Sequence, residues 1–484
     1  MRLIVYFWKR LQSVGAVYEL FLHMPLPGWL VAFLKGLHFR WKQLPLDTRG
    51  VCIGIAIALG MHVFHDLDSI RKLEDSGLDW MIKMNRGVPR MATSQLPPMT
   101  FIDIDERSYR HWGEPLTVPR DKLLSLIRYA VEGGASIIMV DVELSRLISP
   151  DDQALSAYLS GFHLASSAPP EILLARGLRY PLKGGSLFEQ RPSFLDSVVL
   201  SNPHLHWAAP LYSLDDDGVI RHWRLWESTC YTEPVKGVRQ VLALPSFQLL
   251  AATLLAGHEA ASTLSTTLQA YLPASCDPVS DWKAHEEGAL VSVGNLRFHA
   301  RQEHLGQRIL YGLPWHLKAA ESYPIRQGWS ESNHPVFTIK PAVTITEVAQ
   351  LEAHSDLQGQ VVVIGASYAD SRDIYATPLS AMPGSMVIAN SFFSFSYKGE
   401  LEEYPWLKWL TEIVLIVLVA KVFAHLPGLA AKLVASALTL VLLLPISFLL
   451  FRSGVWLDFA IPLAAVEMHA MIGGIEKKLD QLND

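Results

Sequence analysis

Long apolar stretches lie towards both ends of this chain and predict membrane-spanning helices. One covers residues 51–67, near the N-terminus. Three others lie close together near the C-terminus, at residues 406–426, 433–451 and 455–474. A helix that crosses a bilayer needs about 20 mostly apolar residues. For residues 51–67 a buried core helix is the alternative. The pattern predicts one span before, and three spans after, a long middle segment.

The distribution of basic residues predicts the orientation of these spans. Residues 1–49 hold seven lysines and arginines against two acidic residues. Because basic flanks stay on the cytoplasmic side, we expect the N-terminus inside and the middle segment outside. Lys421 and Lys432, and Lys477 and Lys478 after the last span, then lie near inner ends, whereas Arg452 lies in the short outer loop. The predicted order is residues 1–49, cytoplasmic; 50–68, the first span; 69–404, an extracytoplasmic domain; 405–475, three spans; and 476–484, a short cytoplasmic tail.

In a bacterium this order describes a multi-pass protein of the inner membrane, with both termini cytoplasmic and the large domain periplasmic. No cleavable signal peptide is predicted, because Lys9 and Arg10 interrupt the first apolar residues. Residues 1–45 mix aromatic with basic residues, and Pro25 and Pro27 divide them. One interpretation is two amphipathic helices that lie on the inner leaflet. The other is a docking surface for another subunit.

The middle segment alternates between strand and helix patterns. Residues 99–105 alternate like a strand, residues 119–135 repeat apolar positions at helical spacing, and residues 136–144 are typical of a buried strand. This order predicts a βαβ unit, and the fold class is an α/β extracytoplasmic domain plus four transmembrane helices. We expect further strands at residues 171–175, 196–201, 219–226, 289–293, 296–299 and 360–365, a helix at 245–256, and a strand or helix at 385–397.

Composition narrows the classes of function. The mean hydropathy is +0.21, which agrees with membrane segments, and the net charge is −6. No basic patch with interleaved aromatic residues is present, so we expect no nucleic-acid partner. The three cysteines lack the spacing of a zinc site. Cys230 and Cys276 can form a disulfide if they lie outside the cytoplasm, where disulfides persist.

Three aspartates follow the predicted strands of the βαβ unit. Asp103 and Asp105 end the first strand and Asp141 ends the second. Ligands in α/β sheets sit beyond the carboxyl ends of parallel strands, so these carboxylates could hold a cation. Helix capping combined with a salt bridge to Arg120 is the alternative, and we favour it.

Two other polar motifs have structural interpretations. The segment LDDDGVIRHW, residues 214–223, lacks the closing glutamate of a calcium loop, and its Asp217-Gly218 pair predicts a hairpin turn. His204 and His206 have a spacing that can bind metal, but no third ligand lies near them in the sequence. We therefore expect neither a metal nor another cofactor.

The stretch VVVIGASYADSRDIYATPLSAMPGSMVIAN, residues 361–390, has the residue types of an active site but not the patterns. It contains no phosphate-binding loop, and Gly365-Ala366-Ser367 lacks the second glycine of a nucleophile elbow. No nucleophile with a base is found elsewhere, so we expect no catalytic residue and no enzyme. The first residues of this stretch predict a core strand. Asp373 and Thr377 are expected to form a rigid return loop after it.

Several of these motifs, in this order, resemble the type-two CHASE domain. "DERSYRHWGEPLTVPR" is similar to the family's acid and Gly-x-Pro before Pro-Arg, "GASIIMVDVEL" to its Gly-Ala, apolar run and Asp, and "DDDGVIR" to its hairpin. "LPSFQLLAA" is similar to the following helix, and residues 361–390 to the family's last strand with its TPL, PG and AN pairs. The matching residues include Asp105, Arg120, Asp141, Asp217, Gly218, Arg221, Asp373, Thr377 and Asn390.

The resemblance implies an extracytoplasmic sensory domain followed by three spans. It makes Asp105, Arg120, Asp141, Asp373 and Thr377 the expected ligand-binding or signalling residues. The family commonly has histidine where this chain has Ile388, and often where it has Tyr375, so ligand chemistry that depends on those histidines is not expected here. Residues 150–215 are also irregular beside the family pattern.

The segment after the last span is expected to be too short for an output domain, because residues 475–484 cannot form a catalytic domain. The expected function is a sensor or regulatory subunit that signals through other membrane proteins or a separate cytoplasmic effector. A non-enzymatic structural subunit of a larger inner-membrane complex is the alternative. Besides the lipid bilayer, a second copy of the chain is a candidate partner.

Two ionisable residues in the last predicted span also indicate contacts. Glu467 and His469 lie within residues 455–474. An ionised group in the bilayer is costly, by about 2.5–3.5 kcal/mol at its centre, so a cation beside Glu467 would explain its position. That cation can come from this helix bundle or from another subunit. A plain location at the membrane interface is the alternative.

Overall fold

The computed structural model describes most of the chain and divides it into two compact units. The described residues are 41, 43–63, 67–84, 97–145, 151–165, 168–180, 187–233, 237–276, 290–293, 296–299, 308–315, 325–329, 335–347, 355–398, 401, 404–426 and 428–483. The helical unit consists of residues 1–72, 406–444 and 459–484, and the α/β unit of residues 73–405 and 445–458. The amphipathic helices predicted for residues 1–45 lie almost wholly outside the described residues.

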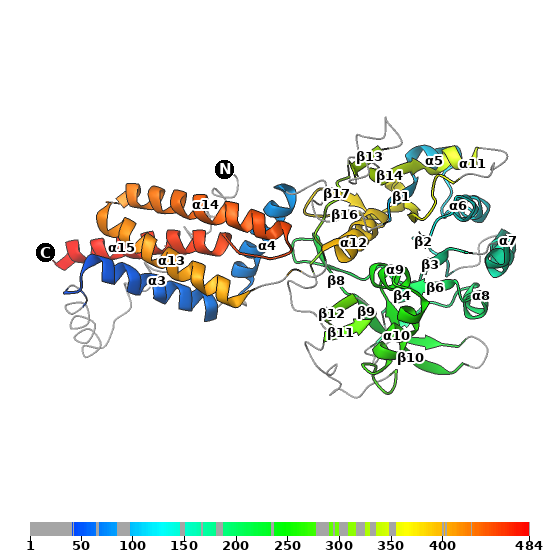
Figure 1. Ribbon diagram of the computed structural model, residues 1–484, viewed down its shortest axis with the longest axis horizontal. Coiled ribbons are helices and arrows are strands. Elements are labelled where there is room, and N and C mark those ends of the chain that lie inside the picture. Colours follow the sequence, from blue (N-terminus) through cyan, green and yellow to red (C-terminus); the bar gives the residue numbers. More distant parts are fainter. Residues whose placement is uncertain are drawn as a thin grey trace. The chain divides into compact units, whose positions relative to one another are not determined.

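The helical unit contains α3 (Leu46–Val63), α13 (Pro405–His425), α14 (Gly428–Arg452) and α15 (Ala460–Asn483), drawn in Figure 1. Among the described residues, α3 and α14 are long and apolar enough to cross a membrane. Helix α13 contains Lys408, Glu412 and Lys421, and the apolar part of α15 covers only Ala460–Gly473. Two of the four predicted spans are therefore supported by length and composition.

Small residues let α3 approach its neighbour closely. A Cβ atom at Gly50 would lie 3.0 Å from Cβ of Ala420, and one at Gly54 would lie 2.8 Å from Cγ2 of Ile416. Both partners are on α13, and close packing of small residues is how helices associate in lipid. Val419, Ala435 and Val466 add an apolar contact among α13, α14 and α15.

The α/β unit is built on a seven-stranded, mostly parallel sheet. Its order is β13 (Ile325–Trp329), β14 (Pro335–Pro341), β1 (Met99–Ile104), β15 (Val361–Ala366), β2 (Ile137–Val140), β3 (Glu171–Ala175) and β6 (Leu205–Ala208). Only β13 is antiparallel to its neighbour. The predicted βαβ strands β1 and β2 are present, but β15 lies between them and pairs with both. The sequence did not predict this insertion.

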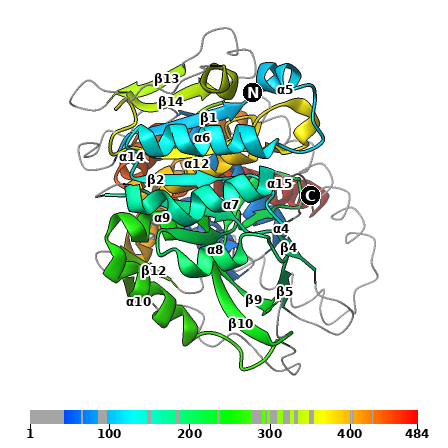
Figure 2. The same cartoon turned by 90° about the vertical axis from the view of Figure 1, so that its right-hand side faces the viewer.

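Helices cover both faces of the sheet (Figures 1 and 2). On one face α6 (Arg120–Glu132), α7 (Asp151–Gly161), α8 (Asp196–Ser201) and α11 (Ala342–Thr346) close the main core with the strands. On the other face α9 (Phe247–Leu255) packs on α12 (Gly384–Lys398), which contacts β15. Residues 385–397, predicted as strand or helix, are helix. The short α5 (Glu106–His111) follows β1, and a 3-10 turn, η2 (Phe162–Ala165), follows α7.

The strand predicted at residues 196–201 is wrong, because this segment is helix α8. Its Val-Val-Leu run has the composition of a strand. In the fold, however, Val198 faces the core, and the buried Asp196 binds Arg176 at 2.5 Å from the first turn. Packing and this ion pair therefore outweigh the weak intrinsic preference of the segment.

A smaller sheet and several hairpins complete the unit. The four-stranded sheet has the order β10 (Arg239–Pro245), β9 (Trp226–Thr232), β5 (Phe188–Gln190) and β4 (Leu178–Arg179). The hairpins are β7 (Tyr212–Leu214) with β8 (Ile220–Trp223), β11 (Leu290–Val293) with β12 (Leu296–His299), and β16 (Ile374–Ala376) with β17 (Ala381–Pro383). The remaining elements are α4 (Asp68–Met84), α10 (His258–Gln269) and the 3-10 turn η4 (Ala369–Ser371).

Cys230 and Cys276 form a disulfide that joins β9 to the segment after α10, across 46 residues of sequence. Their Cα atoms are 5.4 Å apart, within the range that a disulfide requires. The free Cys52 lies on α3 and is exposed.

Candidate functional site

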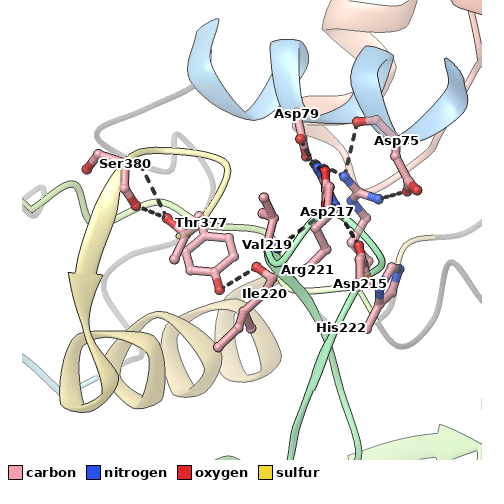
Figure 3. A network of polar contacts seen from close by, with 12 residues as sticks. Asp75, Asp79, Asp215, Asp217, Val219, Ile220, Arg221, His222, Thr377 and Ser380 are labelled. Atoms are coloured by element: carbon pink, nitrogen blue, oxygen red, sulfur yellow. Dashed lines mark hydrogen bonds and ion pairs between the residues drawn. The ribbon is translucent and has the colours of Figure 1, made fainter. Parts of the chain in front are cut away.

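A cluster of charges, shown in Figure 3, joins α4 to the hairpin of β7 and β8. Arg221, on β8, donates to Asp79 of α4 at 3.1 Å and to Asp215 at 2.7 Å. Its other terminal nitrogen reaches Asp217 at 2.8 Å. The side chain of Arg221 is only 9% exposed, so its charge depends on these carboxylates for compensation.

Arg308 provides the second cation of the cluster. Its side chain is fully buried, and it binds both Asp75 and Asp79 of α4, the latter at 2.5 Å. Asp75 and Asp79 are four residues apart and therefore lie on one face of the helix. The backbone of Arg308 itself forms an antiparallel bridge with His222 of β8. One face of α4 is thus joined to the hairpin and to the segment beginning at residue 308.

The carboxylates and Arg221 stabilise each other in their charged forms. Burial opposes the charge of Arg221, but hydrogen bonds to Asp217 and the charge of Asp79 outweigh it and raise its pKa. Burial likewise acts to raise the pKa of Asp215, but hydrogen bonds from His222 and Arg221 lower it. The hydrogen bond from Arg221 is the main cause of the lowered pKa of Asp217.

The hairpin turn predicted at Asp217-Gly218 is present between β7 and β8. Gly218 has a φ of +75°, a conformation that glycine adopts without strain. Asp215 and Asp217, which a calcium loop would use as ligands, instead bind Arg221. The hairpin interpretation is therefore correct, and the turn also positions two members of the charge cluster.

A second polar group lies at the carboxyl edge of the main sheet. Asp141 directly follows β2, and its carboxylate accepts a hydrogen bond from Ser385 at 2.8 Å. Asp373 precedes β16, and its carboxylate lies beside Gly384, at the start of α12. Both aspartates are partly buried. Asp141 and Asp373 are both among the residues predicted to have a ligand-binding or signalling role.

Burial raises the pKa of both carboxyl groups. Burial, followed by the charge of Asp373, raises the pKa of Asp141 to about 7, although the hydrogen bond from Ser385 acts in the opposite direction. Burial also raises the pKa of Asp373, against hydrogen bonds from Tyr375 and Gly384. Burial and the charge of Asp373 raise the pKa of Tyr375 to about 12. The pair can therefore change its protonation near neutral pH.

This pair predicts a pH-dependent stability. An acid whose pKa is raised by folding contributes stability that is complete below its ordinary pKa, 3.8 for Asp141, and that is lost as the pH rises through about 7. In thermal unfolding of the full chain, we expect the midpoint to increase from about pH 8 to about pH 6 by more in the wild type than in Asp141→Asn. Equal changes in the two proteins would contradict the raised pKa of Asp141.

The other residues predicted as ligand-binding have structural partners. Asp105 caps α5 by accepting from the backbone N–H of Ser108 at 2.8 Å. Arg120 forms a buried ion pair with Asp152 at 3.2 Å and donates to the backbone of Glu143. The favoured interpretation was therefore right about capping, but the salt bridge of Arg120 involves none of the three aspartates that end the strands. Thr377 closes the turn before β17 through Ser380.

Glu467 and His469 find their partners within the helical unit of this chain. Glu467 on α15 binds Lys432 on α14 at 2.5 Å. His469 is 3.1 Å from the backbone oxygen of Gly50 on α3, and it packs on the ring of Phe423. Of the two sources of a cation considered for Glu467, the same bundle supplies it here.

Asp75, Asp79 and Arg308, which form the centre of the charge cluster, were not predicted from the sequence. A usable signal was the segment DSIRKLEDSGLDWMIKM, residues 68–84, which is amphipathic and repeats aspartate at an interval of four. Nothing in the sequence indicated that Arg308, more than 200 residues later, supplies the counter-charge.

Comparison with known proteins supports the resemblance drawn from the motifs. The sequence model of the CHASE2 domain matches residues 52–424, a range that begins within α3 and ends within α13. No curated protein and no solved structure has a significant match to the chain. The matched range includes both the charge cluster and the carboxyl pair.

Proposed function

The chain belongs to the CHASE2 domain family, and from that membership we propose that it is a membrane-bound sensor or regulatory subunit whose outer domain signals through α4. CHASE2 domains are extracellular sensory domains of membrane proteins. The observation that carries the proposal is the buried binding of Arg308 to two aspartates of α4, the helix that follows α3 in the chain. A change in the α/β unit can reach the membrane segments by this connection.

The proposal includes a four-span arrangement. Helices α3 and α14 satisfy the requirements of a span, and α13 and α15 contact them through residues of the same unit. The pairing of Lys432 with Glu467 lowers the cost of placing both charges in a bilayer. With basic residues concentrated before α3, both termini lie in the cytoplasm and the α/β unit lies in the periplasm of a bacterium.

The first step of the proposed route leads from the carboxyl pair to α12. Ser385, in the first turn of α12, donates to Asp141, and Gly384 donates through its backbone N–H to the backbone oxygen of Asp373 at 2.8 Å. A ligand or proton that changes the charge of the pair therefore acts directly on the start of α12.

The second step leads from α12 to the segment that begins at Arg308. The buried Asn390 accepts hydrogen bonds from the backbone N–H groups of Gly312 and Leu313, at 3.0 and 2.8 Å, and donates to the oxygen of Leu313. Ser394 accepts from the N–H of Leu310 at 2.9 Å. These bonds fix the backbone that positions Arg308.

The third step leads from Arg308 to α4. Helix α4 also contains Glu74, whose carboxylate accepts a hydrogen bond from the indole N–H of Trp456 at 3.3 Å. Trp456 lies in the segment between α14 and α15. Helix α4 thus contacts residues that precede the last span. Coupling through a contiguous network still requires a direct measurement.

The output of the proposed sensor is a separate protein. Other membrane proteins or a cytoplasmic effector receive the signal, and a second copy of this chain is a further candidate. The site residues that we assign to the route hold hydrogen bonds and ion pairs, and none is assigned a catalytic role.

Amide hydrogen exchange of the full chain in detergent tests the route. Asn390→Ala removes the bonds to residues 312 and 313, so we expect faster exchange in those amides and in α4. Thr253→Ala, on the neighbouring α9, is the matched control, because the buried Thr253 hydroxyl donates to its own helix at Leu249. It should leave the exchange of α4 unchanged.

Unchanged amide exchange of α4 in Asn390→Ala would contradict the proposed route.

The same protein preparations distinguish a sensor from a structural subunit. Constant stoichiometry with other membrane proteins, together with unaltered α4 protection in both variants, would favour the structural subunit.

A further inference from the structure

Three histidines converge on one buried glutamate at the end of the main sheet opposite the carboxyl pair. Glu171 is the first residue of β3, and its two oxygens lie 2.7 Å from Nδ1 of His204 and 2.7 Å from Nε2 of His206. Nε2 of His258, the first residue of α10, is 3.2 Å from the same oxygen that faces His204. The exposed fraction of Glu171, taken over the whole residue, is 7%.

The fold brings these residues together from three distant segments. Strands β3 and β6 are parallel neighbours, with Ile172 paired to Leu205, so the residues preceding them, Glu171 and His204, are adjacent. His206 follows His204 by two positions and therefore projects from the same face of its strand. Helix α10 begins at His258, directly after Gly257, whose φ of +117° allows the chain to turn there.

This carboxylate is surrounded by side chains that commonly bind metals. Within the described residues, Glu171 pairs only with histidines. A buried carboxylate is stabilised when it is paired with positive charges or coordinates a metal ion.

We propose that Glu171, His204 and His258 bind a divalent transition-metal ion of the zinc class, and that His206 positions the glutamate. One carboxylate and two imidazoles are a donor set that zinc uses, with the fourth position open to water. The three ligand atoms lie within 4.8 Å of one another. Zinc bonds of about 2.0–2.2 Å are compatible with that spacing after a small separation of the hydrogen-bonded atoms.

The surroundings of the cluster fit a metal site. His258 has a side chain 65% exposed, so an ion can enter from solvent and exchange without unfolding. His206 binds the second oxygen of Glu171, the kind of outer contact that orients a ligating carboxylate. Imidazole favours zinc, copper or nickel over calcium and magnesium, which prefer oxygen ligands. No third ligand lies near His204 and His206 in the sequence, but the fold brings Glu171 of β3 and His258 of α10 to them.

Zinc titration of the full chain in detergent tests this site. The chain should lack a histidine tag and carry Cys52→Ser, because the exposed thiol of Cys52 also binds zinc. We expect saturable binding of one ion per chain by competition with a chromogenic chelator, and a tetrahedral absorption spectrum with Co²⁺.

Variants assign the binding to the cluster. His258→Ala, at an exposed position, and Glu171→Gln should each weaken zinc binding by more than about tenfold, and His206→Ala by about 10–100-fold. His111→Ala, an exposed histidine beside Glu347 on another part of the domain, is the matched control and should not change the affinity. If the starting protein binds no zinc, or if His258→Ala and Glu171→Gln bind it as tightly as the control, the histidines serve only as hydrogen-bond partners of Glu171 and the proposal is wrong.

Discussion

Arg308→Met is expected to destabilise the α/β unit by about 3–5 kcal/mol, because it removes one partner of a buried ion pair. The side chain of Arg308 is fully buried, and those of Asp75 and Asp79 are 12% and 13% exposed. Methionine can fill most of the space but removes the arginine that binds both carboxylates, while Arg221 still binds Asp79. Denaturant unfolding of the full chain in detergent measures the change in the free energy of unfolding.

An exposed ion pair provides the matched control. Arg179 binds Glu189 at 3.0 Å with 55% of its side chain exposed, so Arg179→Met should cost about 0–1 kcal/mol. A second variant separates lost charge from lost packing. Adding Asp75→Asn to Arg308→Met removes one uncompensated carboxylate, and we expect it to recover part of the lost stability. A loss for Arg308→Met as small as the control's would show that the charge cluster does not hold α4.

The sequence predicted much of the central sheet correctly. The strand expected at residues 360–365 is β15 (Val361–Ala366), and the strand expected at residues 171–175 is β3, with those bounds. These segments are short apolar runs bounded by turn residues, so their local pattern is sufficient to identify them. Membership of the family could also be recognised, because its motifs keep a fixed order along the chain.

The pairing of strands could not be predicted in the same way. β15 lies between β1 and β2, although about 220 residues of sequence separate it from β2. Hydrophobic periodicity indicates that a strand has a buried face but does not indicate which strand is its neighbour. The same limit explains why Asp141 was grouped with Asp103 and Asp105 in the prediction and not with Asp373.

Charged residues were predicted least well. Asp75 and Arg308 are ordinary surface residue types when read in isolation, and their burial depends on a contact across 233 residues. Glu171 and His258 were missed for the same reason, because the sequence analysis searched for ligands close to His204. A polar residue acquires its function from partners brought by the fold, and local sequence does not contain that information.

Gly365→Val is expected to cause the largest loss of stability at the carboxyl edge of the sheet. A Cβ atom at Gly365 would lie 1.8 Å from the hydroxyl of Ser385 and 2.6 Å from its Cβ, and it would also contact Asp141. The requirement for glycine is therefore one of close approach between β15 and α12.

The size of the residue at position 365 sets the expected order of the effects. Gly365→Ala should cost about 1–3 kcal/mol by overpacking, and Gly365→Val more, because valine adds two methyl groups to the same space. Thermal and denaturant unfolding of the full chain measure both. Gly161→Val, at a position where a Cβ atom meets nothing within 4 Å, is the matched control and should cost much less.

A compensating variant identifies the cause of this loss. Ser385→Gly removes the side chain that an added Cβ at position 365 would meet, so Gly365→Ala combined with Ser385→Gly should be more stable than the sum of the two single effects predicts. Strict additivity would mean that Gly365 is required for a reason other than its contact with Ser385. It would also weaken the first step of the proposed route, which depends on the close contact of β15, Asp141 and the start of α12.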